Sequence, residues 1–194
     1  YIKGGIKMKK TNVGVILVGI LAILVVLCVT SYNGMVAKKE KIDNELSNLN
    51  VSLQRRADLI PNLISTVKGY TKYEENVVNK VLEARDKLVK ANSIEDKSSA
   101  NNELSESLKS LMVVVENYPD LKASQNFVSL QDELAGTENR IAVARKNYND
   151  AVKEYNTNVK KFPNVILANV FGFEQEVYFQ TDEKNSEVPN VSFE

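Results

Sequence analysis

A long uncharged segment near the N-terminus constrains this chain more than any other feature. No charged residue lies between Thr11 and Val36, and the seventeen residues of Val13–Val29 are all apolar or glycine. With a rise of about 1.5 Å per residue, a helix over residues 11–32 is about 33 Å long, which is enough to cross a hydrocarbon core of about 30 Å. The sequence therefore predicts one transmembrane helix over residues 11–32.

A cleavable signal peptide is the main alternative to an uncleaved anchor. The apolar part of such a signal normally covers about 7–15 residues and ends at a small-residue cleavage site. The apolar run here is longer, and no such site follows it. Lipidation of Cys28 would call for a small residue before it, but Leu27 stands there. We expect an uncleaved, single-pass anchor in the lipid bilayer, with Cys28 as an embedded apolar residue.

The first seven residues differ in character from a native N-terminus. Residue 1 is Tyr, which does not initiate translation, and the first methionine is Met8. A purine-rich back-translation of Lys3-Gly4-Gly5 resembles a bacterial ribosome-binding site. We expect residues 1–7 to be an untranslated leader, with Met8 as the true start; the alternative is a fragment of a longer protein.

The charges that flank the anchor decide its orientation only weakly. Lys9 and Lys10 on its N-terminal side favour a cytoplasmic N-terminus, which places the rest of the chain outside the cell. Lys38, Lys39 and Lys41 lie almost as close on the other side. The balance slightly favours an extracytoplasmic body at the cell membrane.

Beyond the anchor, apolar residues recur in alternating steps of three and four. Such stretches cover residues 32–53, 63–88, 104–118 and 127–162, with Tyr70 in the second and Phe162 at the end of the fourth. This spacing is typical of helices that pack lengthwise at shallow angles, as in a coiled coil. Short connections make successive helices antiparallel. The predicted fold is all-α: an antiparallel up-and-down four-helix bundle over residues 33–173, whose first helix continues from the anchor.

The predicted helices are separated by recognisable breaks. Pro61 disfavours helical geometry at the preceding residue and suits the first turn of a new helix, so Arg55–Pro61 is expected to be the first turn. Ala91–Ser93 is expected to end the second helix and Tyr118–Asp120 the third. Phe162-Pro163 is expected to end the fourth.

The segment after Pro163 is apolar but too short to span a bilayer. Its candidate patch consists of Ile166, Leu167, Val170, Phe171 and Phe173. A cap on one end of the bundle is the simpler interpretation, and a membrane-interface or partner-binding patch is the functional one. Residues 174–194 contain six acidic residues and one Lys, which predicts a loosely ordered acidic tail.

Several polar residues stand out as a candidate interaction or structural cluster. They are Arg55, Arg56, Asp58, Glu116, Thr137, Glu138, Asn139 and Arg140. Arg and Asp at the first predicted turn are expected to pair and to fix how the first two helices meet. Thr137 falls on an apolar seam, where one polar residue can set the register. A ligand or partner site is the alternative for this cluster.

The composition limits the chemistry that is available. The chain has no His and one Cys, so histidine bases, the usual zinc sites and internal disulfides are excluded. Its 25 basic and 25 acidic residues give no net charge, which argues against nucleic-acid binding. We expect no catalytic residue, cofactor or metal. Glu74, Glu75 and Glu116 leave a carboxylate-dependent hydrolase as the alternative.

A family resemblance covers most of the body. The stretches that carry it are Arg55–Leu63, Val67–Tyr70, Ala84-Arg85, Glu116–Ala123, Asn126-Phe127, Gly136–Ala142, Ala144-Arg145, Tyr148-Asn149, Tyr155-Asn156, Phe171–Phe173 and Tyr178-Phe179. Together they resemble the LemA family across residues 31–179. The resemblance implies a bacterial single-span membrane protein with a helical bundle of bromodomain-like topology. It supplies no enzymatic activity, because the molecular function of the family is unsettled. It places the short N-terminus outside the cell, opposite to the charge argument.

These observations favour a non-enzymatic, membrane-tethered scaffold or adaptor at the cell envelope that binds a protein partner of unknown identity. The carboxylate-dependent hydrolase is the second hypothesis. A third is an architectural protein that curves the membrane without a partner.

Overall fold

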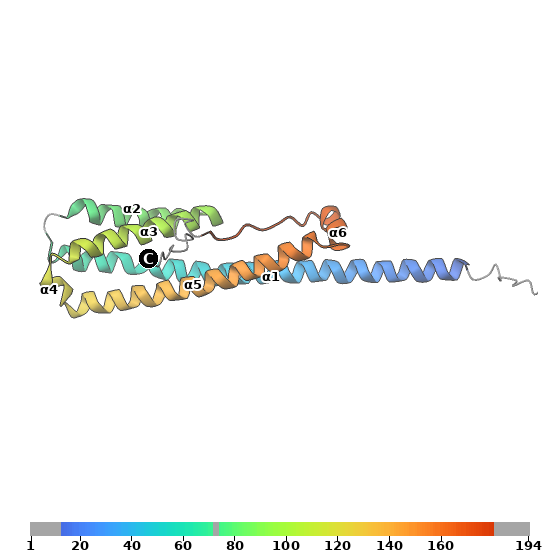
Figure 1. Cartoon of the computed structure of the whole chain (residues 1–194), viewed down its shortest axis with the longest axis horizontal. Helices are drawn as coiled ribbons and strands as arrows, with labels where there is room; N and C mark the ends of the chain where they lie inside the picture. The colour runs from blue at the N-terminus through green and yellow to red at the C-terminus, as the bar shows by residue number, and fades with distance from the viewer. Residues whose placement is uncertain (1–12, 72–73, 181–194) are drawn as a thin grey trace, which may run out of the picture.

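The computed structural model describes residues 13–71 and 74–180. Across these residues every regular element is a helix, and no strand occurs (Figure 1). The helices are α1 (Val13–Lys68), α2 (Glu75–Lys90), α3 (Ile94–Val115), α4 (Pro119–Lys122), α5 (Gln125–Lys160) and α6 (Asn164–Phe171). The all-helical class predicted from the sequence is confirmed. The expected leader over residues 1–7 and the first two residues of the expected anchor lie outside the described residues.

Helix α1 joins the apolar N-terminal segment to the body without a break. Its 56 residues make it about 84 Å long. The large apolar side chains from Val15 to Val29 are exposed, and this half of α1 extends beyond the other helices (Figure 1). By length and composition, α1 is the one helix among the described residues that could cross a membrane.

The predicted turn at Arg55–Pro61 is wrong, because α1 continues through Pro61 to Lys68. Proline has no N–H, so the helix cannot supply the usual donor to the carbonyl oxygen of Ala57, four residues earlier. Arg85 of α2 replaces it: its Nε donates to that oxygen over 3.4 Å. The chain instead reverses after Lys68, where Gly69 follows the last helical residue.

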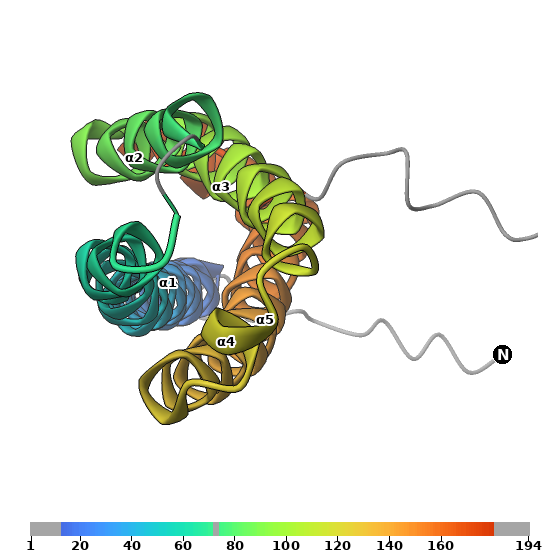
Figure 2. The ribbon, with the colours of Figure 1, turned by 90° about the vertical axis from the view of Figure 1, so that its left-hand side faces the viewer.

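The long helices pack in two pairs. Helix α1 runs along α5, and α2 runs along α3; α2 and α3 lie beside only the part of α1 and α5 that is distant from the apolar segment (Figures 1 and 2). Most seam positions predicted from the sequence are buried, including Met35, Ile42, Leu49, Leu53, Leu63, Val67, Val81, Ala84, Leu88, Leu104, Leu111, Phe127, Ile141, Tyr148 and Tyr155. Tyr70 and Phe162 are exposed instead, because the helices end just before them.

An extended segment follows α6 and returns along the body. Gly172 has a positive φ of 74° and turns the chain at the end of α6, where the Phe173 N–H donates to the Ala168 carbonyl oxygen. Residues 173–180, here called the strap, then run back toward the connection between α2 and α3 (Figure 1). Side chains of α5 bind the strap and Phe179 is buried. The expectation of a loosely ordered tail is therefore wrong for residues 174–180, and the rest of that tail lies outside the described residues.

Candidate functional site

Arg56 is the buried centre of the predicted polar cluster. Its Nη1 donates to the Asn101 side-chain oxygen over 2.6 Å, and its Nη2 donates to the Ser105 hydroxyl over 3.0 Å, both on α3. On the other side, Nη1 lies 2.9 Å from a carboxylate oxygen of Glu138 on α5. Burial lowers the pKa of Arg56, and the charge of Glu138 acts in the opposite direction. One guanidinium therefore connects α1, α3 and α5.

The other predicted polar residues do not form one site. Arg55 pairs with Glu133 at 3.0 Å on the surface, and Asp58 accepts from Gln54 one turn away on α1. Thr137 is buried, and its hydroxyl donates to the Glu133 carbonyl oxygen within α5. The pairing of Arg with Asp58 that the sequence suggested is not what the structure shows.

Glu116 is separate from the Arg56 cluster and pairs with Lys122 of α4. Glu74 accepts a 3.3 Å hydrogen bond from the Tyr118 hydroxyl, and Glu75 is exposed at the start of α2. Within the described part of the chain, no three His, Cys, Asp or Glu side chains are grouped so as to hold a metal ion. Glu74 and Glu75 line one pocket of about 410 Å³ beside Lys68, whereas Glu116 is not part of that lining.

Asn139 and Arg140 line a groove between α1 and α5, here called the α1–α5 groove. Its volume is about 590 Å³. Its lining consists of Glu45, Asn48, Val51, Ser52, Asn139, Arg140, Val143, Ala144 and Asn147. Val51 and Val143 are 67% and 61% exposed. The groove combines an apolar centre with amide, hydroxyl and charged groups.

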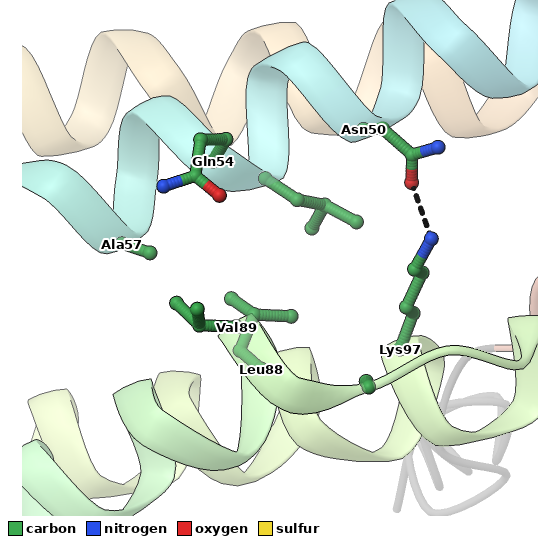
Figure 3. A pocket seen from close by; sticks show the side chains of 8 residues that line it. Asn50, Gln54, Ala57, Leu88, Val89 and Lys97 are labelled. Carbon is green, nitrogen blue, oxygen red and sulfur yellow. Dashed lines mark hydrogen bonds between the residues drawn. The ribbon is translucent and has the colours of Figure 1, made fainter.

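A smaller cavity lies between α1 and the end of α2 (Figure 3). Its volume is about 150 Å³, below the roughly 300 Å³ at which small-molecule pockets begin. Lys97 is the charged residue of its lining, and its Nζ donates to the Asn50 side-chain oxygen over 2.9 Å. Leu88 and Val89 face α1 across the gap (Figure 3). This cavity is too small to form a ligand site.

The predicted apolar patch is divided between two environments. Leu167 and Phe173 pack partly against the core, whereas Ile166, Val170 and Phe171 are exposed. The rings of Phe171 and Phe173 also meet Tyr32 of α1 edge to face, at centroid distances of 5.0 and 5.5 Å. Helix α6 therefore sits beside α1 just where the apolar segment ends.

Sequence reasoning missed the groups that hold the strap. The Asn156 amide nitrogen donates to the Glu176 carbonyl oxygen, and its oxygen accepts from the Glu176 N–H, both at 2.8 Å. Asn149 makes the same pair of bonds with Phe179 at 3.0 and 2.9 Å. The Tyr148 hydroxyl donates to the Val177 carbonyl oxygen over 2.8 Å. Tyr148-Asn149 recurs seven residues later as Tyr155-Asn156. This repeat is the signal in the sequence that could have revealed how α5 binds the strap.

Ion pairs reinforce the same end of the body. Lys39 of α1 pairs with Glu176 of the strap. Lys38 and Lys41 both bind Glu154 of α5, and their hydrogen bonds lower the pKa of Glu154 to about 2. These contacts connect α1, α5 and the strap next to the apolar segment.

Comparison with known proteins gives a consistent family. The LemA family model matches residues 45–193. Magnetosome proteins MamQ 1 and MamQ 2 of Paramagnetospirillum magneticum are each 27% identical, covering 77% of this chain and 64% of the relative. Protein LemA of Metamycoplasma hominis is 25% identical, covering 78% of this chain and 69% of the relative. The chain thus spans just under two thirds of the length of the MamQ proteins it matches. An all-helical body with an apolar N-terminal helix and a family match over most of its length make this chain a member of the LemA family.

Proposed function

We propose that this protein is a non-enzymatic scaffold that is tethered to the bacterial cell membrane and binds another protein. In this proposal α1 crosses the bilayer once and continues into an up-and-down bundle of α1, α2, α3 and α5. The continuous α1 supports it, because a helix without a hinge fixes the body relative to the anchor. The body is placed on the extracytoplasmic side, which the flanking lysines slightly favour.

The α1–α5 groove is the observation that carries the protein-binding part of the proposal. Protein interfaces combine exposed apolar centres with Arg and polar rims. Val51 and Val143 supply the apolar centre, and Arg140 lies on the same face. No side chain in this lining suggests chemistry on a small substrate. For the alternative of a carboxylate-dependent hydrolase, Glu74 and Glu75 line one pocket, whereas Glu116 pairs with Lys122 instead.

Site-specific photo-crosslinking in growing cells tests this function. A photoreactive residue at Val143 is expected to give a discrete crosslinked species, whereas the same residue at Val113, exposed on α3, is expected to give none. Val143→Asp should abolish crosslinking from a second reactive residue placed at Val51. Equal crosslinking from Val143 and Val113, or none from either, would contradict the proposal.

The compartment of the body requires a separate measurement. Protease added to intact cells is expected to degrade the body and leave the anchor behind. Full protection in intact cells, followed by digestion after lysis, would place the body in the cytoplasm and reverse the orientation.

A further inference from the structure

We propose that α6 and the adjoining Phe162 form a second lipid-contacting surface, which lies in the interfacial layer of the bilayer that the anchor crosses. This proposal rests on the proposed membrane anchor but not on any protein partner. The lipids that this surface would contact are those at the boundary between headgroups and acyl chains. Four observations support it: position, direction, exposure and charge.

The position of α6 matches the expected membrane surface. The uninterrupted apolar stretch of α1 ends at Val29, and Tyr32 follows within one helical turn. A helix from residue 11 to residue 32 already spans the full hydrocarbon thickness of about 30 Å. Because Phe171 and Phe173 pack on the Tyr32 ring, α6 is held at the depth where α1 leaves the lipid. Tyrosine is itself enriched at that depth.

The direction of α6 fits a helix in the plane of the interface. It lies across α1 rather than along it (Figure 1). If α1 stands close to the membrane normal, α6 lies close to the membrane plane. An apolar helix in that orientation buries one face in the headgroup and acyl boundary.

The described part of the chain leaves much of α6 exposed. Only Ala168 of α6 is buried, so the inward face is limited to that residue and the half-buried side chains beside it. Phe162 is 81% exposed and Val170 is 71% exposed, and Ile166 and Phe171 are each more than half exposed. A cap for the bundle would bury its large apolar groups against the body. Phe162, Ile166 and Val170 are instead left exposed, close to the point where the apolar segment of α1 ends.

The proposed lipid-contacting surface differs from the rest of the body in its charge. Residues 164–171 contain no charged side chain. Exposed Lys160 and Lys161 come immediately before Phe162. Lysines at the edge of an apolar interfacial helix favour anionic headgroups. The position of these lysines matches the headgroup layer, whereas the apolar residues match the acyl boundary.

Tryptophan fluorescence tests the proposal directly, because the natural chain has no Trp. The full chain carrying Val170→Trp is reconstituted into phosphatidylcholine–phosphatidylglycerol vesicles whose acyl chains are brominated near the headgroup. The matched control is Val113→Trp, since Val113 is also 71% exposed but lies near the distal end of α3. Val25→Trp in the anchor reports whether α1 itself is in lipid. Phe162→Trp is a second, independent probe of the proposed surface.

Brominated lipid is expected to lower the emission of V170W and F162W by about twofold, with V113W unchanged. Aqueous iodide is expected to quench V113W more strongly than V170W and F162W. If brominated lipid quenches V25W but neither V170W nor F162W, the proposal is overturned while the anchor stands. This holds both where iodide reaches residues 162 and 170 and where a protein covers them. If V25W is not quenched, the anchor and this inference both fail.

Discussion

The Nε–H of Arg85 donates to the carbonyl oxygen of Ala57 over 3.4 Å, and this is the oxygen that Pro61 leaves without a helical donor. A side chain of α2 thus supplies this oxygen of α1 with a donor from outside its own helix. The contact lies where α1 passes through the proline, and α1 continues for another two turns beyond it.

Replacing Arg85 tests this compensation. Arg85→Met is expected to destabilise the protein by about 1 kcal/mol, because the Ala57 oxygen loses its donor. In a Pro61→Ala background the restored N–H bonds that oxygen, so the same Arg85 substitution should cost clearly less. Chemical denaturation of the full chain in detergent measures both values. Equal costs in the two backgrounds would show that Arg85 does not act through the proline.

Arg56 and Arg55 are neighbours in the sequence, but replacing them is expected to change the stability of the protein by very different amounts. Arg56→Met breaks buried contacts to Asn101 and Glu138, and the polar groups left behind raise the cost to about 2–3 kcal/mol. Arg55→Met breaks only an exposed pair with Glu133, which is worth about 0.5 kcal/mol or less. Denaturation midpoints of the two variants should differ in that order; similar midpoints would contradict the assigned roles.

The side-chain amides of Asn149 and Asn156 on α5 are expected to stabilise the strap without affecting the stability of the rest of the body. Asn149→Asp combined with Asn156→Asp removes both amide donors and sets carboxylates against carbonyl oxygens. Hydrogen exchange of the Glu176 and Phe179 amides is expected to accelerate at least tenfold, about 1.4 kcal/mol, while exchange in α2 and α3 stays unchanged. Asn147→Asp, an exposed neighbour, is the control and should change neither region.

Tyr148 gives the strap a dependence on alkaline pH. Burial, with a further contribution from the charge of Glu176, raises the pKa of Tyr148 to about 12. The folded state favours the neutral hydroxyl, so its contribution is complete below the unfolded pKa of about 10 and is lost as pH rises toward 12. Tyr148→Phe should cost about 1 kcal/mol at neutral pH and should remove this alkaline loss. Unfolding measured across that range, with tyrosinate absorbance, checks both.

The sequence pattern predicted the helical core well and the chain reversals less well. Ile42, Leu49 and Ile141 were identifiable because burial on a helix follows a local period. Pro61 was misjudged because the sequence does not show that Arg85, a residue of another helix, donates to the Ala57 oxygen. No period in the sequence could predict such compensation.

The strap and the polar cluster show the same limitation. An extended segment bound through its backbone leaves no periodic pattern of its own, and only the Tyr-Asn repeat on α5 hinted at it. The prominence of Arg56 was predicted, but its partners Asn101 and Glu138 come from α3 and α5. Contacts between distant segments depend on tertiary packing.

Because α1 has no break from its apolar end to Lys68, it can act as a lever. About 55 Å of helix lies beyond Tyr32. A change of about 10° in the tilt of the anchor would carry the far end of the body sideways by about 10 Å, and changes in bilayer thickness alter such tilts. In the proposed membrane-anchored arrangement, a change in bilayer thickness would therefore move the distal end of the body sideways.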